Sequence, residues 1–138
     1  MRSFRPTVAQ VDLGAVRHNV RTLKPAGSEL MAVVKADGYG HGDVAVARAA
    51  LEAGASWLGV ALVEEGAELR DAGIEAPILL LSQPPVEAAR AVVDAGLTPV
   101  VHSARFVDAL PTVLAGLAAH QEKDAAGPNR PNRPNRPQ

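Results

Sequence analysis

One recurring unit constrains the fold of this chain more than any other feature of its sequence. An Ala-Gly dipeptide repeatedly follows a helix-like stretch and precedes a short apolar run. Glycine just past a helix end adopts the left-handed conformation at little cost, and continuous runs of branched residues are typical of strands buried on both faces. The dipeptides lie at 26–27, 53–54, 72–73 and 95–96, and the runs are LMAVV, WLGVALV, PILLL and LTPVV.

The stretches between the apolar runs predict helices. The first covers 11–24, with Asp12 as a candidate N-cap and a stripe formed by Leu13, Val16, Val20 and Leu23. Three more are expected at 42–54, with Asp43 as cap, at 64–73, and at 85–96, where Pro85 suits a first helical turn. A last helical region at 103–120 is expected in two pieces, because Pro111 interrupts the backbone hydrogen bonds.

This alternation of strands and helices predicts an α/β fold with a parallel sheet and right-handed crossovers. We expect an initial strand near 7–11, a helix, and then about four β-α units. The Ala-Gly pairs are separated by about 23 residues, which is typical of a (β/α)8 TIM-type barrel. Such a barrel needs about 250 residues, so the chain of 138 residues is expected to form a partial barrel with an uncovered inner face.

The C-terminal stretch differs in kind from the rest of the chain. Its sequence GPNRPNRPNRPQ (127–138) repeats Pro-Asn-Arg three times and offers almost nothing to bury. A segment of this composition cannot offset the entropy lost on ordering. The sequence therefore predicts two parts, a barrel portion at 1–122 and a disordered tail at 123–138.

Charge and composition exclude several classes of function. A net charge of −1 gives no general reason to expect binding to nucleic acid or to a membrane. The absence of cysteine excludes disulfides and thiolate chemistry. No signal-like or membrane-spanning apolar run occurs, so a cytoplasmic location is expected. No metal site is expected, because the histidines are scattered at positions 18, 41, 102 and 120.

The stretch VVKADGYGHG (33–42) places a lysine at the carboxyl end of the first strand of the repeat. Since strand residues alternate between faces, Met31, Val33 and Lys35 should point to one side, and Ala32 and Val34 to the other. If the first set lines a barrel, Lys35 reaches its mouth, where chemistry is found in this fold. Burial there would lower the pKa of the lysine, and a neutral amine can attack an aldehyde to form a Schiff base.

The residues that follow favour a phosphorylated aldehyde as the ligand. Gly38, Gly40 and Gly42 allow positive φ and a close approach of the backbone, and the next helix directs its amides toward the same mouth. The Tyr39 hydroxyl can donate to a phosphate oxygen, and pyridoxal phosphate (PLP) fits this set. The alternatives are a solvated lysine, a plain strand-to-helix turn and a packing tyrosine, with His41 as a turn residue rather than a base.

At this stretch the chain resembles the alanine racemase family, PLP enzymes built from a barrel and a β-domain. AVVKADGYGHG is similar to the cofactor-attachment signature of that family, and RPTVAQVDLGAVRHNV to its usual opening. The resemblance extends from about residue 5 to 120. It implies a catalytic Lys35 that holds PLP and Tyr39 on the cofactor phosphate. Leu81, at the end of the run PILLL, is expected beside the cofactor ring from its strand-end position alone.

The resemblance also implies a reaction and a partner. Family members interconvert L- and D-alanine, which supplies D-alanine for the cell wall, with the lysine acting on the D-alanine side. A tyrosine from the partner subunit of a homodimer acts on the opposite face. That tyrosine, and the arginine facing the pyridine nitrogen, belong to family regions beyond the stretch that this chain resembles. We therefore expect an N-terminal fragment that is inactive alone.

Several alternatives stay open from the sequence. One is a non-catalytic PLP-binding barrel of the cofactor-homeostasis type, which also holds PLP on a lysine. Another is a half-barrel without function that associates through its open edges. A basic amino acid decarboxylase shares the lysine but fits the DGYGHG turn less well. A serine-preferring racemase is also compatible with these residues.

Overall fold

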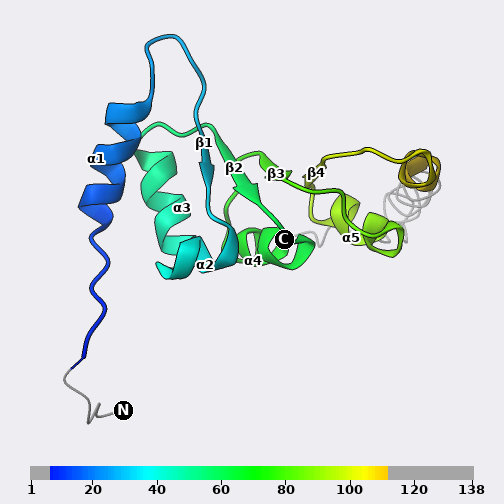
Figure 1. Cartoon of the computed structure of the whole chain (residues 1–138), viewed down its shortest axis with the longest axis horizontal. Helices are drawn as coiled ribbons and strands as arrows, with labels where there is room; N and C mark the ends of the chain where they lie inside the picture. The colour runs from blue at the N-terminus through cyan, green and yellow to red at the C-terminus, as the bar shows by residue number, and fades with distance from the viewer. Residues whose placement is uncertain (1–6, 112–138) are drawn as a thin grey trace, which may run out of the picture.

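The computed structural model of the chain describes residues 7–111 (Figure 1). Helices and strands alternate through this range, as the repeating unit predicts, although the strands are shorter than the apolar runs. In chain order the elements are α1 (Leu13–Leu23), β1 (Met31–Val33), α2 (Lys35–Gly40), α3 (Asp43–Glu52), β2 (Trp57–Val60), α4 (Val63–Asp71), β3 (Ile78–Leu80), the 3-10 turn η1 (Val86–Ala88), α5 (Ala89–Asp94) and β4 (Thr98–Pro99). Residues 104–111 are also helical.

The strands form one parallel sheet whose spatial order follows the sequence, β1-β2-β3-β4. The register places Val33 beside Gly59, and Gly59 beside Leu79. Leu79 in turn lies beside Thr98. Each strand is thus joined to the next by a helical crossover, which is the arrangement of a (β/α)8 barrel. The predicted α/β class, parallel sheet and β-α units are confirmed.

Among residues 7–111, the core lies on one face of this sheet. Leu58, Val60, Ile78 and Leu80 point to that face and are almost fully buried, together with Leu69 of α4 and Val92 of α5. On the opposite face Met31 and Val33 are each 37% exposed. The prediction that the strands are buried on both faces is therefore wrong for β1 within residues 7–111, because the helices described there pack against one side. The inner face is open, as expected for a partial barrel.

The glycines of the last three Ala-Gly pairs end the helices as predicted, whereas α1 already ends at Leu23 with Lys24 as its cap, before Gly27. Gly54, Gly73 and Gly96 have φ of +109°, +79° and +58°, which is the left-handed conformation that a β-carbon disfavours. Each turn also carries the long hydrogen bond of a Schellman motif. The donors and acceptors are Ala55 N–H to Ala50 O at 3.0 Å, Ile74 N–H to Leu69 O at 3.0 Å and Leu97 N–H to Val92 O at 2.9 Å.

A basic side chain from each unit binds the helix-ending turn of the next unit. A cation near the last carbonyls of a helix is favourable, because these groups form the negative end of the helix dipole. We call these contacts the cation ties. They are Lys24 Nζ to Gly54 O at 2.8 Å, Arg48 Nη2 to Ala72 O at 2.7 Å, and Arg70 to Ala95 O at 2.9 Å and Gly96 O at 3.1 Å.

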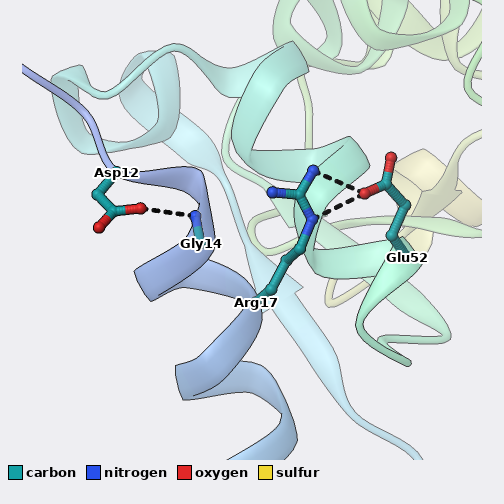
Figure 2. A network of polar contacts seen from close by, with 4 residues as sticks. All are labelled: Asp12, Gly14, Arg17 and Glu52. Atoms are coloured by element: carbon teal, nitrogen blue, oxygen red, sulfur yellow. Dashed lines mark hydrogen bonds and ion pairs between the residues drawn. The ribbon is translucent and has the colours of Figure 1, made fainter.

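Helix α1 begins at the predicted cap and leans against α3. Asp12 Oδ1 accepts from the backbone N–H of Gly14 at 2.8 Å and of Ala15 at 3.1 Å. Arg17 of α1 reaches Glu52 at the end of α3, with an Nη2 to Oε2 distance of 2.7 Å (Figure 2). Val20 of α1 is buried against Ala50 of α3, whereas Leu23 is exposed. The predicted apolar stripe therefore ends before Leu23.

The predicted initial strand near 7–11 is wrong, because residues 7–12 adopt neither strand nor helix. This segment leads away from the sheet (Figure 1), and Val8 is 81% exposed. A strand needs a hydrogen-bonded neighbour, and none within residues 7–111 lies beside it. The helix predicted at 85–96 is divided into η1 and α5, with Pro85 preceding the first turn.

Some predictions concern positions beyond the described range. The second helical piece after Pro111, the boundary at residue 122 and the tail at 123–138 lie outside residues 7–111 and stay predictions. Within the described residues, no helix has both the length and the apolar character needed to cross a membrane.

Candidate functional site

The carboxyl end of β1 leads directly into the lysine that the sequence singles out. Val34 follows the strand, is 1% exposed and donates its N–H to Gly59 O of β2 at 2.9 Å. Lys35 comes next and is half-buried. The predicted alternation is confirmed up to this point, since Met31 and Val33 lie on the open face and Val34 lies in the core.

Side chains of the open face converge on Gly59 in the middle of β2. A β-carbon at Gly59 would lie 3.1 Å from Met31 Sδ, 3.4 Å from Val33 Cγ2 and 3.5 Å from Leu81 Cδ2. The three side chains therefore occupy the space that a larger residue at position 59 would fill. Leu81, which the sequence places at the end of its strand, lies on the same open face as β1's exposed residues.

The turn after Lys35, which forms most of the element labelled α2, has an unusual backbone. Ala36, Asp37, Gly38 and Tyr39 all adopt left-handed helical angles, with φ between +52° and +59°. Three of them carry a β-carbon, and this conformation costs such residues about 1–2 kcal/mol each. The sequence predicts positive φ at the glycines but gives no sign of it at Ala36, Asp37 and Tyr39. Strain of this kind persists only where surrounding contacts enforce it.

Hydrogen bonds within the segment close the turn. Gly38 N–H donates to Val34 O at 2.9 Å and Gly42 N–H donates to Asp37 O at 2.9 Å. His41 Nδ1 lies 3.0 Å from Gly38 O, which agrees with its interpretation as a turn residue. The segment therefore presents Lys35 and Tyr39 from a closed left-handed turn rather than from an extended loop.

The start of α3 differs from the prediction in one respect. Its N-cap is Gly42, and Asp43 is the first helical residue. The buried Asp43 carboxylate accepts from Val44 N–H at 2.6 Å, while Asp43 N–H donates to Asp37 Oδ1 at 3.2 Å. At the start of α3 it is therefore the Asp37 side chain that accepts a backbone N–H, a role that the sequence assigns to Asp43. The positive φ of Gly42 allows the chain to bring Asp37 beside this helix start.

Lys35 and Tyr39 lie close together on this turn. The Lys35 Nζ atom is 5.9 Å from the centre of the Tyr39 ring, within the range of a cation–π contact. Tyr39 is 60% exposed, so the ring is not a core residue. The arrangement leaves an amine and a phenol side by side at the carboxyl edge of the sheet.

Glu65, in the first turn of α4, is the residue of this site that sequence reasoning missed. Its Oε1 accepts from Ala36 N–H at 2.7 Å, and its Oε2 accepts from Ala61 N–H at 2.8 Å and Leu62 N–H at 3.1 Å. Partial burial opposes ionisation, but these three donors and the nearby Lys35 ammonium outweigh it and lower the pKa of Glu65 below 4.5. The only sequence signal is an acid at the third helical position, where it can bind its own N-cap.

Comparison with known proteins gives a consistent result. Residues 11–124 match the family model described as alanine racemase, N-terminal domain. The alanine racemase of Symbiobacterium thermophilum is 56% identical over 109 residues, covering 78% of this chain and 29% of that protein. That of Mycobacterium avium is 53% identical over 108 residues, covering 77% and 28%.

Solved structures agree with these sequence relatives. Alanine racemase from Streptomyces coelicolor A3(2) superposes with a TM-score of 0.72 at 38% identity, covering 78% of this chain and 30% of that one. The enzyme from Bacillus anthracis with bound L-Ala-P gives 0.71 at 39%, covering 77% and 28%. The chain thus spans less than a third of the length of these relatives.

Proposed function

Because the chain belongs to the alanine racemase family, through the N-terminal domain of that family, we propose that it supplies the cofactor lysine of a PLP-dependent racemase. The reaction is the interconversion of L- and D-alanine, and its product provides D-alanine for the cell wall. The observation that carries the proposal is the Lys35 amine at the carboxyl edge of a parallel sheet, beside an exposed phenol.

The residues at this edge fit PLP in three respects. Lys35 offers a primary amine, which is the group that condenses with an aldehyde. The exposed Tyr39 would offer a hydroxyl to a phosphate oxygen, and it lies on the left-handed turn beside Lys35. Leu81, on the open face, offers an apolar contact to a ring. When bound, PLP withdraws electrons from the α-carbon of an amino acid, so that its proton can leave.

The two side chains of the turn then have separate tasks. Lys35 Nζ takes the α-proton from one face of the substrate or returns it there. Inversion requires that a second group act on the opposite face. Tyr39 is the one tyrosine of the 138-residue chain, and its ring centre is only 5.9 Å from Lys35 Nζ. We assign Tyr39 to the phosphate. We assign the second proton transfer to a tyrosine of the partner subunit in the homodimer of a whole racemase, at a position outside the part of the family that this chain matches.

This division of tasks leads to a proposal about activity. The chain by itself binds PLP through Lys35 but forms little or no D-alanine, because it lacks a second tyrosine to act on the opposite face. The non-catalytic PLP-binding barrel considered from the sequence is not favoured, since the matching family model and the relatives are alanine racemases. The choice of alanine as substrate depends on the same relatives.

The test uses the whole chain with PLP, followed by borohydride reduction and mapping of the modified lysines. We expect modification at Lys35 and its loss in Lys35→Ala. Lys24 serves as an internal control, because its Nζ is bound to Gly54 O away from the site. Equal modification of Lys24 and Lys35 would contradict the cofactor assignment. Rapid formation of D-alanine from L-alanine by the chain alone would contradict the proposed inactivity.

A further inference from the structure

Glu65 joins the turn that carries Lys35 to the end of the neighbouring strand. One carboxylate oxygen binds Ala36, the residue directly after the lysine, and the other binds Ala61 and Leu62, directly after β2. The contact spans 29 residues of sequence. Among the hydrogen bonds described within residues 7–111, it is the only one from a side chain outside the segment 34–43 to the left-handed turn.

The position of this contact matters for the lysine. Ala36 is the first left-handed residue, with φ of +52°, so its backbone angles set the direction in which the chain leaves Lys35. An alanine has no preference of its own for this conformation. A 2.7 Å hydrogen bond to an ionised acceptor is among the stronger contacts available to a backbone N–H. The carboxylate therefore stabilises an arrangement that the local sequence disfavours.

We propose that Glu65 is a positioning residue for Lys35, which holds the left-handed turn by accepting the Ala36 N–H and so fixes where the lysine side chain begins. Glu65 is not expected to contact the substrate. The inference about the turn stands on the contacts of this chain, and its consequence for PLP rests on the proposed function.

A simpler role must be separated from this one. At the third position of α4, Glu65 also binds the N–H of Leu62, the residue that precedes the helix, and this contact alone stabilises the helix start. A role limited to α4 leaves Ala36 and Lys35 unaffected when the carboxylate is removed. The discriminating measurements are therefore made at these two residues and not on overall stability.

The chain offers a matched pair of variants. Glu65→Gln keeps the size of the side chain but leaves a single acceptor oxygen for donors that now use two. Glu64→Gln makes the same charge change in the same helical turn, where the side chain is exposed and accepts no hydrogen bond within residues 7–111. Both variants are made in the full 138-residue chain, and their circular dichroism is compared with that of the unmodified protein.

Two readouts are expected to respond only to Glu65→Gln. Hydrogen exchange of the Ala36 amide should become about tenfold faster, because a hydrogen bond to a charged group is lost. Borohydride-trapped attachment of PLP to Lys35 should slow by about tenfold, since a misplaced reacting group loses rate steeply. Attachment at Lys24 should stay unchanged. Unaltered Ala36 exchange and unaltered Lys35 attachment in Glu65→Gln, or equal effects of Glu64→Gln, would overturn the proposal.

Two further outcomes are kept distinct. If the unmodified chain fails to attach PLP at Lys35, the proposed function is wrong, while Ala36 exchange still decides whether Glu65 holds the turn. If Glu65→Gln does not fold, the unmodified protein is titrated by NMR. The Ala36 amide resonance should then follow the protonation of Glu65, because the Glu65 carboxylate accepts the Ala36 N–H at 2.7 Å. An Ala36 resonance that does not change through this titration would contradict the inference.

Discussion

Gly38 lies directly against Asp43 at the start of α3. A β-carbon at position 38 would lie 3.2 Å from the backbone nitrogen of Asp43 and 3.3 Å from its Cα. Because both atoms belong to the backbone, and Asp43 is buried, neither can move aside easily. This contact explains why the turn needs glycine at position 38 even though its neighbours carry side chains.

A β-carbon at Gly38 should therefore cost more than one at Gly40. Both glycines have positive φ, but nothing lies within 4 Å of a β-carbon at Gly40. We expect Gly38→Ala to lower the free energy of unfolding by about 2–3 kcal/mol, and Gly40→Ala by about 1 kcal/mol. Urea unfolding of both variants measures the difference. Equal losses would show that backbone strain, and not the contact with Asp43, decides the cost.

Arg70 is expected to be the most important of the cation ties. It donates to Ile74 O at 2.6 Å and Ala76 O at 2.8 Å as well as to the turn at Ala95 and Gly96. We expect Arg70→Met, which keeps the apolar stem, to lower the free energy of unfolding by about 2–3 kcal/mol.

Arg90 provides the control for this prediction, because its only polar contact within residues 7–111 is an exposed ion pair with Asp94 on the same helix. We expect Arg90→Met to cost less than about 0.5 kcal/mol. The two variants can be compared by thermal and urea unfolding. A loss in Arg70→Met no larger than that in Arg90→Met would mean that the four carbonyls bound by Arg70 find other donors.

Removing the N-cap of α1 should lower the free energy of unfolding by less than Arg70→Met does. Asp12→Ala removes the acceptor of the Gly14 and Ala15 N–H groups and should cost about 1 kcal/mol. Asp12→Asn keeps an acceptor oxygen and should retain most of this stability. Helix content from circular dichroism and the urea midpoint test both variants. If Asp12→Ala and Asp12→Asn behave alike, hydrogen bonding at the cap is not the source of the effect.

The lowered pKa of Glu65 predicts a specific dependence of stability on pH. A carboxyl group whose pKa is lower in the folded protein stabilises the fold above its unfolded pKa, and this contribution is lost as the pH falls through the folded value. The extra stability of the unmodified protein relative to Glu65→Gln should therefore disappear as the pH falls below 4.5.

This prediction can be checked by urea unfolding of the two proteins in steps from pH 7 to pH 3. The difference in the free energy of unfolding should be constant in the neutral range and shrink in acid. Glu64→Gln, compared in the same way, controls for the removal of one negative charge from the first turn of α4. A difference that does not vary with pH would refute the link between the ionisation of Glu65 and the stability of the fold.

Much of the fold follows from local signals in the sequence. The glycines of the repeat end helices through backbone chemistry that depends on few neighbours, so Gly54, Gly73 and Gly96 could be assigned in advance. The strand at 7–11 failed because a strand depends on a neighbour as well as on its own residues. Strand β2 stops at Val60, short of its apolar run, because Glu65 takes the next two backbone N–H groups.

The candidate site was predictable only in outline. The position of Lys35 follows from the alternation of residues in β1, and its glycine-rich context is visible in the sequence. The left-handed angles of Ala36 and Tyr39 are not, because they contradict the local preference of these residues. Glu65 lies 29 positions from Ala36, and no periodicity in the sequence connects them.

The cation ties have a consequence for how the chain is made. Each of them runs from an earlier unit to the following one, and the strands also lie side by side in the order of the sequence. A newly synthesised unit therefore meets a docking partner that has already left the ribosome, so the protein can be assembled in the direction of translation. Pairing only with adjacent units also keeps loop closure short, which favours rapid folding.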